Sequence, residues 1–247
     1  MNRDFRTDDF YIGYLPKAPE SLAKILVRIV TALILLGLLV GVLLVLGQSP
    51  FAASKFEYGQ YREYDGVLEK RPYPVLLTRD SRFLLVAAGK HGLAETVQGM
   101  EGNSVRLKGS LIQRGPDAVL EVLPGSLQAS LSGIPNTSRL IDLGPIKLTG
   151  EIVDSKCYLG VMNPGNGKVH RDCAARCISG GVPPAFIARD ASGDIRTLLL
   201  TGPDGQSLNR EVLAFVAEPI EISGRLVRSG STLLLKADPA GFRHPGE

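Results

Sequence analysis

The fold is decided by two stretches that align with each other: VRLKGSLIQRG at residues 105–115 and IEISGRLVRSG at residues 220–230. The offset between the copies is 115 residues throughout, and the strand-like segments that follow, around Val119 and Leu234, keep it. Each copy reads as a hairpin of long strands closed at a glycine turn, with another glycine inside the first strand. A glycine there suits a bulge or a sharp coil in a closing barrel. The repeat therefore predicts two related β units.

A weaker similarity precedes each hairpin. YDGVL at residues 64–68 resembles TGEIV at residues 149–153 when Gly66 is aligned with Gly150, which gives an offset of 84 residues. Because the offset grows from 84 to 115 residues before the hairpin, the second unit should carry an insertion of 31 residues. All three cysteines fall in this interval, so only the second unit is expected to hold a chemical site.

The rest of the body also reads as strands, because short runs rich in Val, Leu and Ile alternate with turn residues. Strands are expected at residues 83–88, 104–113, 119–123, 146–153, 195–200, 218–227 and 232–237. Short helices are expected at residues 93–98, 168–178 and 209–215. The sequence predicts a mainly β protein in which a single N-terminal transmembrane helix precedes two related small OB-like β units. One β-sandwich made of both units is the alternative.

An uncharged apolar segment, IVTALILLGLLVGVLLVLG, covers residues 29–47. As a helix it would be roughly 28 Å long, which matches the hydrocarbon core of a bilayer. Basic residues gather before it, at Arg3, Arg6, Lys17, Lys24 and Arg28. This bias predicts a single-pass protein of a bacterial inner membrane with a cytoplasmic N-terminus and a periplasmic body. A signal peptide cleaved near residues 51–54 is the alternative.

These features divide the chain into six segments. We expect a cytoplasmic tail at residues 1–23, the transmembrane helix at 24–47 and a linker at 48–62. The first β unit should then cover residues 63–128, a second linker 129–144, and the second β unit with its Cys/His insertion 145–243.

The composition excludes some classes of function. The net charge is only +3, and no basic stripe with interleaved aromatic residues occurs, so no nucleic-acid partner is expected. The sequence contains no G-x-S-x-G motif, no P-loop and no paired carboxylates. A non-catalytic protein is therefore favoured over an enzyme.

The candidate site is a C-x15-C-x3-C pattern with one histidine: Cys157, His170, Cys173 and Cys177. Three thiols and an imidazole form the ligand set of a Cys3His zinc site. Met162 adds a thioether to the segment, and this makes copper the second candidate.

Two aspartates flank these candidate ligands. Asp154 and Asp172 are expected either to orient His170 as carboxylates behind the ligands or to cap a turn or helix.

Helix geometry restricts how the cysteines combine. If residues 169–179 form a helix, His170 and Cys177 are seven residues apart and separated by about 10.5 Å along the axis, too far to share one ion easily. Cys173 and Cys177, at i and i+4, are also too far apart to form a disulfide with each other. We therefore expect Cys157, from another segment, to be the partner either in a shared metal site or in a disulfide with Cys173 or Cys177. Three thiols that stay free and buried are the remaining alternative.

The residues around these cysteines resemble a known motif. GEIVDSKC at residues 150–157, HRDCAARC at 170–177 and GVP at 181–183 are similar to uncharacterised exported bacterial proteins. In those proteins an OB-like β domain carries D-x-x-C, then H-x-x-C-A-x-x-C, then G-x-P. The resemblance covers about 35 residues. It implies an exported compartment and a barrel, and no particular activity.

Two functions follow as hypotheses. The first is a membrane-anchored periplasmic accessory or binding subunit, with a partner in a membrane-protein complex and a Cys/His site that is either metal-binding or disulfide-stabilised. The second is a thiol redox or copper-handling protein that serves an exported respiratory enzyme. The sequence identifies no small-molecule substrate.

Overall fold

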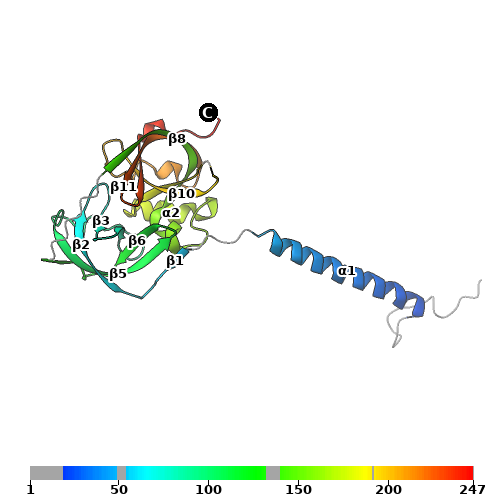
Figure 1. Ribbon diagram of the computed structural model, residues 1–247. Coiled ribbons are helices and arrows are strands. Elements are labelled where there is room, and N and C mark those ends of the chain that lie inside the picture. Colours follow the sequence, from blue (N-terminus) through cyan, green and yellow to red (C-terminus); the bar gives the residue numbers. More distant parts are fainter. Residues whose placement is uncertain (1–18, 49–53, 132–139, 191, 247) are drawn as a thin grey trace, which may run out of the picture. The chain divides into compact units, whose positions relative to one another are not determined.

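A computed structural model describes residues 19–48, 54–131, 140–190 and 192–246 of the chain (Figure 1). Residues 1–18 of the predicted tail and parts of both predicted linkers, at 49–53 and 132–139, lie outside the described residues. The described residues from 54 onward form one compact body, and those up to residue 48 form a separate unit.

The N-terminal unit consists of helix α1 (Glu20–Leu46), which follows Pro19 and ends at Gly47. Within it, the segment Leu22–Leu46 is long and apolar enough to cross a membrane. A helix of this composition has no polar face to present to water, so its apolar side chains need a nonpolar environment. The predicted apolar N-terminal helix is confirmed.

The first β unit is a closed five-stranded barrel. Its strands are β2 (Arg62–Glu69), β3 (Val75–Leu77), β4 (Arg82–Val86), β5 (Ser104–Arg114) and β6 (Asp117–Val122). They pair in the order β5–β2–β3–β4–β6, and β6 closes the barrel by pairing with β5. All these pairs are antiparallel except β4–β6. Two short strands, β1 (Ser54–Phe56) and β7 (Gln128–Ala129), also pair with β5.

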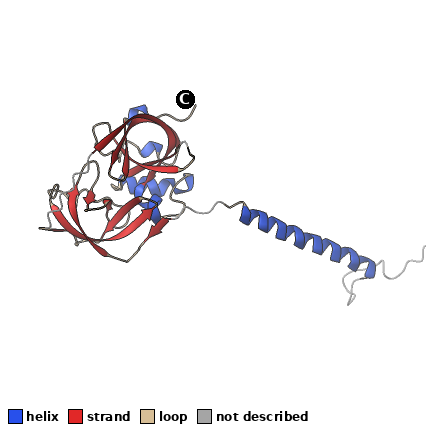
Figure 2. Cartoon of the chain, viewed as in Figure 1, coloured by secondary structure: helices blue, strands red, loops and turns tan. Residues whose placement is uncertain are grey.

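The second unit is a closed barrel with the same pairing order. Figure 2 shows its strands curving into a ring. Its strands are β8 (Leu140–Asp154), β9 (Pro184–Arg189), β10 (Ile195–Thr201), β11 (Pro219–Ser229) and β12 (Thr232–Ala237). The registers also correspond, because Gly66 pairs with Val105 in the first barrel and Gly150 pairs with Ile220 in the second. The repeat and the OB-like class are confirmed, and the alternative of one β-sandwich is wrong.

The two glycines of the weaker similarity have the same structural role. A Cβ atom on Gly66 would fall well inside van der Waals contact with the carbonyl oxygen of Leu77, and one on Gly150 would do the same with Ile187. Each glycine therefore allows the first strand of its barrel to coil tightly against the second.

The insertion of the second barrel is divided between two places. Leu76 of β3 corresponds to Phe186 of β9, an offset of 110 residues against 84 for the preceding strands. The increase from 84 to 110 means that 26 extra residues lie between β8 and β9. The further increase from 110 to 115 places the other five extra residues in the β9–β10 hairpin. The cysteines lie in the larger piece, the loop between the first and second strands, which OB folds often use for binding.

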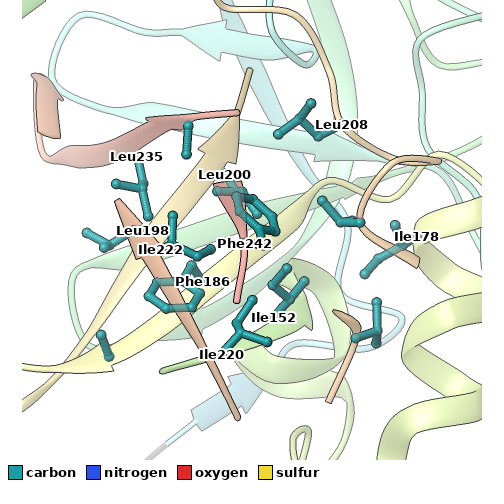
Figure 3. Close-up of a cluster of buried hydrophobic side chains, with 14 of the residues drawn as sticks. Ile152, Ile178, Phe186, Leu198, Leu200, Leu208, Ile220, Ile222, Leu235 and Phe242 are labelled. Carbon is teal, nitrogen blue, oxygen red and sulfur yellow. The ribbon is translucent and has the colours of Figure 1, made fainter. Parts of the chain in front are cut away.

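Each barrel has its own apolar core. Figure 3 shows the core of the second barrel, where the side chains of Ile152, Phe186, Leu200, Ile220, Ile222 and Leu235 are fully buried. A further buried cluster joins the barrels, because Val86 and Ile112 of the first pack with Val153, Tyr158 and Val182 of the second. The apolar contact explains why the two barrels form one compact body.

The predicted short helices are only partly right. Residues 93–98 form successive turns rather than a helix, and at 209–215 only a 3-10 turn (Leu213–Phe215) is present. Both segments are shorter than two helical turns, so they gain few hydrogen bonds for the cost of nucleation. The segment predicted at 168–178 does contain a helix, α2 (Arg171–Ser179).

Candidate metal centre

The insertion begins where β8 ends at Asp154. The backbone N–H of Cys157 donates to Asp154 Oδ1 at 2.7 Å, and the chain then forms a π-helical turn (Cys157–Val161). A 3-10 turn (Lys168–His170) leads into α2, which ends before Gly180. Gly181 follows with φ of 95°, a left-handed conformation that suits glycine at the end of a helix.

Cys157 belongs to both groups of candidate metal ligands in the structure. Its sulfur, a ring nitrogen of His170 and the Cys173 sulfur all lie within 4.8 Å of one another. The Cys157 and Cys177 sulfurs, with an oxygen of Asp154, form a second group within the same limit. As expected, the residue from outside the helix lies next to both helical cysteines.

The four predicted ligands therefore form two overlapping groups, because His170 and Cys177 belong to different ones. His170 precedes α2 in the 3-10 turn, whereas the sequence predicted it inside the helix. Cys177 lies near the other end of α2. His170 and Cys177 thus lie towards opposite ends of α2, and this separation explains why Cys157 is common to both groups.

The disulfide expected from Cys157 to Cys173 or Cys177 is not present. All three cysteines are free, and the Cys157 and Cys177 sulfurs are 3.9 Å apart. A disulfide requires about 2.05 Å. Their contact, followed by burial, raises the pKa of the Cys157 thiol, and the same contact lowers the pKa of Cys177. Of these two buried thiols, Cys177 is therefore the one that loses its proton more readily.

The two flanking aspartates differ. Asp154 is fully buried, and its Oδ2 lies 3.2 Å from Nε2 of His170, a residue that is only 3% exposed. A carboxylate in this position fixes the tautomer and orientation of the imidazole. Asp172 is exposed in the first turn of α2, where a negative charge is favourable to the helix. Asp154, and not Asp172, contacts His170.

The first barrel supplies a residue that the sequence did not reveal. Lys90 Nζ donates a hydrogen bond of 2.8 Å to the Cys173 sulfur, across a separation of 83 residues. This hydrogen bond raises the pKa of Lys90. Only a glycine-rich turn marks Lys90 in the sequence, so nothing there connects it to the cysteines.

A buried lysine fixes the loop that carries Lys90. Lys156, only 3% exposed, donates to the carbonyl oxygens of Ala87 at 2.9 Å and Gly89 at 2.7 Å. It also forms an ion pair with Glu121 of β6. Because a buried charge is tolerated only with such partners, Lys156 ties the insertion to the first barrel.

A pocket of about 390 Å³ opens onto the thiols. Phe56, Tyr58 and Tyr61 of the first barrel line it together with Met162 and the three cysteines. Cys157 and Cys177 are buried, and Cys173 is partly exposed. The candidate site thus lies at the junction of the barrels and uses residues of both, whereas the sequence predicted a site of the second unit alone.

The donor set suits a soft metal ion. Thiolate and imidazole are ligands that zinc and copper(I) accept, and the hard ions magnesium and calcium prefer oxygen. Burial of most donors and a carboxylate behind the imidazole are typical of built metal sites. The residues present therefore fit a soft metal, and their identity alone does not choose between zinc and copper.

The fold and the cluster define a class: a protein of two OB-like barrels with a soft-metal candidate site at their junction, preceded by a helix long enough to span a membrane. No known protein family, curated protein or solved structure matches this chain.

Proposed function

We propose that this protein is a membrane-anchored accessory or binding subunit that holds one soft metal ion through Cys157, His170 and Cys173. A binding role is favoured over a catalytic one. It belongs with the exported OB-like proteins that its motif resembles, and it faces the periplasm as a subunit of a membrane-protein complex. The anchor is α1, and the basic residues before it support this orientation.

One observation carries the metal proposal: the donor atoms of Cys157, His170 and Cys173 lie within 4.8 Å of one another. A metal with ligand bonds of about 2.0–2.3 Å fits among donors at such distances after small movements. The three residues come from the π-helical turn, the 3-10 turn and α2. Convergence of three separate elements on one point is what a binding site requires.

The test combines metal analysis with thiol counting on the full-length protein, purified in detergent without chelators. We expect one zinc or copper per chain and three titratable thiols after metal removal. Cys157→Ser should abolish stoichiometric metal, because this residue belongs to both groups of donors. Asp172→Asn is the matched control, since Asp172 is exposed.

Two results would overturn the proposal. The first is a wild-type protein that stays metal-free after incubation with either ion. The second is full metal occupancy in Cys157→Ser. A C-terminal reporter that is active only in the periplasm tests orientation separately, and a silent but stable fusion would contradict the exported body.

A second candidate, thiol exchange with an exported respiratory enzyme, is favoured by Cys173, which is partly exposed and next to the Lys90 ammonium. Here the Cys173 sulfur would attack a partner disulfide, forming a mixed disulfide and releasing one partner thiolate. Cys157 would then attack the Cys173 sulfur, and its proton would pass to the second partner sulfur, which leaves as a thiol. The partner gains two electrons, and a Cys157–Cys173 disulfide remains. Mass spectrometry after reaction with oxidised glutathione tests this, because a mixed disulfide that persists on Cys173 would exclude the second step.

A further inference from the structure

We propose, on the basis of the metal site above, that the metal is copper(I) as a transferable cargo, and that Met162 is the residue through which it enters and leaves. The geometry points to a store that exchanges its ion with a partner, rather than to a closed structural site.

Access to the site is uneven. Cys157 is 4% exposed and His170 is 3% exposed, so an arriving ion cannot meet them first. Cys173 is partly exposed, and it lines the pocket that opens to solvent. A structural zinc site fills all four coordination positions with protein ligands, whereas three donors converge in this group. An open side next to one ligand instead permits exchange.

Met162 stands on this open side. It lines the same pocket as the three cysteines, and its side chain is 43% exposed. Its backbone N–H donates to the carbonyl oxygen of Cys157 at 3.0 Å, which fixes the chain at Met162 relative to that ligand. The backbone of Met162 is therefore fixed next to the site, while its side chain remains reachable from solvent.

The thioether also discriminates between the two candidate metals. Thioether sulfur is a soft neutral donor that binds copper(I), whereas zinc sites are built from thiolate, imidazole and carboxylate. A methionine at the pocket gives zinc no additional ligand. For copper(I) it offers a first contact before the buried thiols.

The transfer needs no change in oxidation state. Copper enters as copper(I) from a partner's sulfur donor, and a bond to the Met162 sulfur forms as one donor bond breaks. Bonds to Cys173 and Cys157 then replace the remaining donor bonds, and each thiol releases its proton as it binds. Delivery to an acceptor follows the same steps in reverse.

The test compares Met162→Leu with Met100→Leu, a matched change at a methionine on the core of the first barrel. Full-length protein loaded with copper(I) is mixed anaerobically with bicinchoninate, and protein loaded with zinc is mixed with 4-(2-pyridylazo)resorcinol. We expect Met162→Leu to slow copper(I) transfer about tenfold, the scale on which residues around a metal site act. Its copper affinity, the zinc transfer rate and all rates of Met100→Leu should stay close to wild type.

The outcomes separate this inference from the proposed function. Unchanged copper transfer in Met162→Leu would overturn the role of the thioether, and so would equal slowing of copper and zinc, which would indicate a steric effect. In both cases the metal site itself would stand. A wild-type protein that binds zinc and not copper(I) would refute copper(I) as the cargo and leave the metal site standing. Failure to bind either ion would refute both the metal site and the copper(I) cargo.

Discussion

Lys90 and Cys173 connect the two barrels at the candidate site, because the Lys90 ammonium donates to the Cys173 sulfur at 2.8 Å from the opposite barrel. The lysine is near the surface, so it adds little to stability. Its effect should instead be on what approaches the sulfur.

Lys90→Gln should weaken the reaction of Cys173 with anionic reagents. A unit charge about 4 Å away contributes ~1 kcal/mol in water, so we expect about a fivefold loss with dithionitrobenzoate relative to neutral iodoacetamide. Lys108→Gln, an exposed lysine of β5, is the control. An equal loss with both reagents, or an equal loss in the control, would contradict a local electrostatic effect.

The flanking aspartates should behave differently when each is changed to asparagine. Asp154→Asn removes the buried carboxylate that orients His170, so the metal dissociation constant should rise about 10–100-fold, as for other carboxylates behind a metal ligand. Asp172→Asn should leave it unchanged. Competition with a chromophoric chelator measures both, and equal effects would mean that Asp154 does not support the site.

The buried Lys156–Glu121 pair should be the strongest polar link between the barrels. Lys156→Met leaves the Glu121 carboxylate buried without its cation, which should lower the free energy of unfolding by about 3–5 kcal/mol. The double variant Lys156→Met/Glu121→Leu should recover part of that loss, because no unpaired charge remains. Lys108→Met removes an exposed pair and should cost less than about 0.5 kcal/mol. Urea unfolding compares them, and additive losses in the double variant would argue against a buried ion pair.

Gly150 should not tolerate even a methyl group. Gly150→Ala would force its Cβ against the Ile187 carbonyl, with an expected loss of about 1–3 kcal/mol. Gly241→Ala serves as the control, because a Cβ there meets no atom within 4 Å. Thermal unfolding measures the melting temperatures of the two variants. Equal values would show that β8 can move enough to accept the added methyl group.

Sequence pattern predicts the elements whose signal is local. The two long hairpins repeat with a constant offset, so their strands and their glycines can be matched from the amino-acid sequence alone. Strands β3 and β9 were not predicted. The first has three residues and the second begins at Pro184, so neither offers the alternating pattern on which the expectation depends.

The part of the site that depends on helix geometry could be predicted from the sequence. The part that depends on how the two barrels pack together could not. Spacing alone required a partner from outside α2, and Cys157 lies beside both helical cysteines. The contacts of Lys90 and the contribution of Tyr58 depend on how one barrel packs on the other. No local pattern encodes that packing, and the same limitation explains why the absent disulfide could not be excluded.

The common pairing order of the barrels has a historical consequence. Two units with matching registers are what a tandem gene duplication leaves in one chain. The thiols belong to one copy, whereas Lys90 and the aromatic rim belong to the other. Neither barrel alone contains all the residues that line this pocket. Cutting the chain between the barrels would therefore divide the pocket, even if each half kept its own fold.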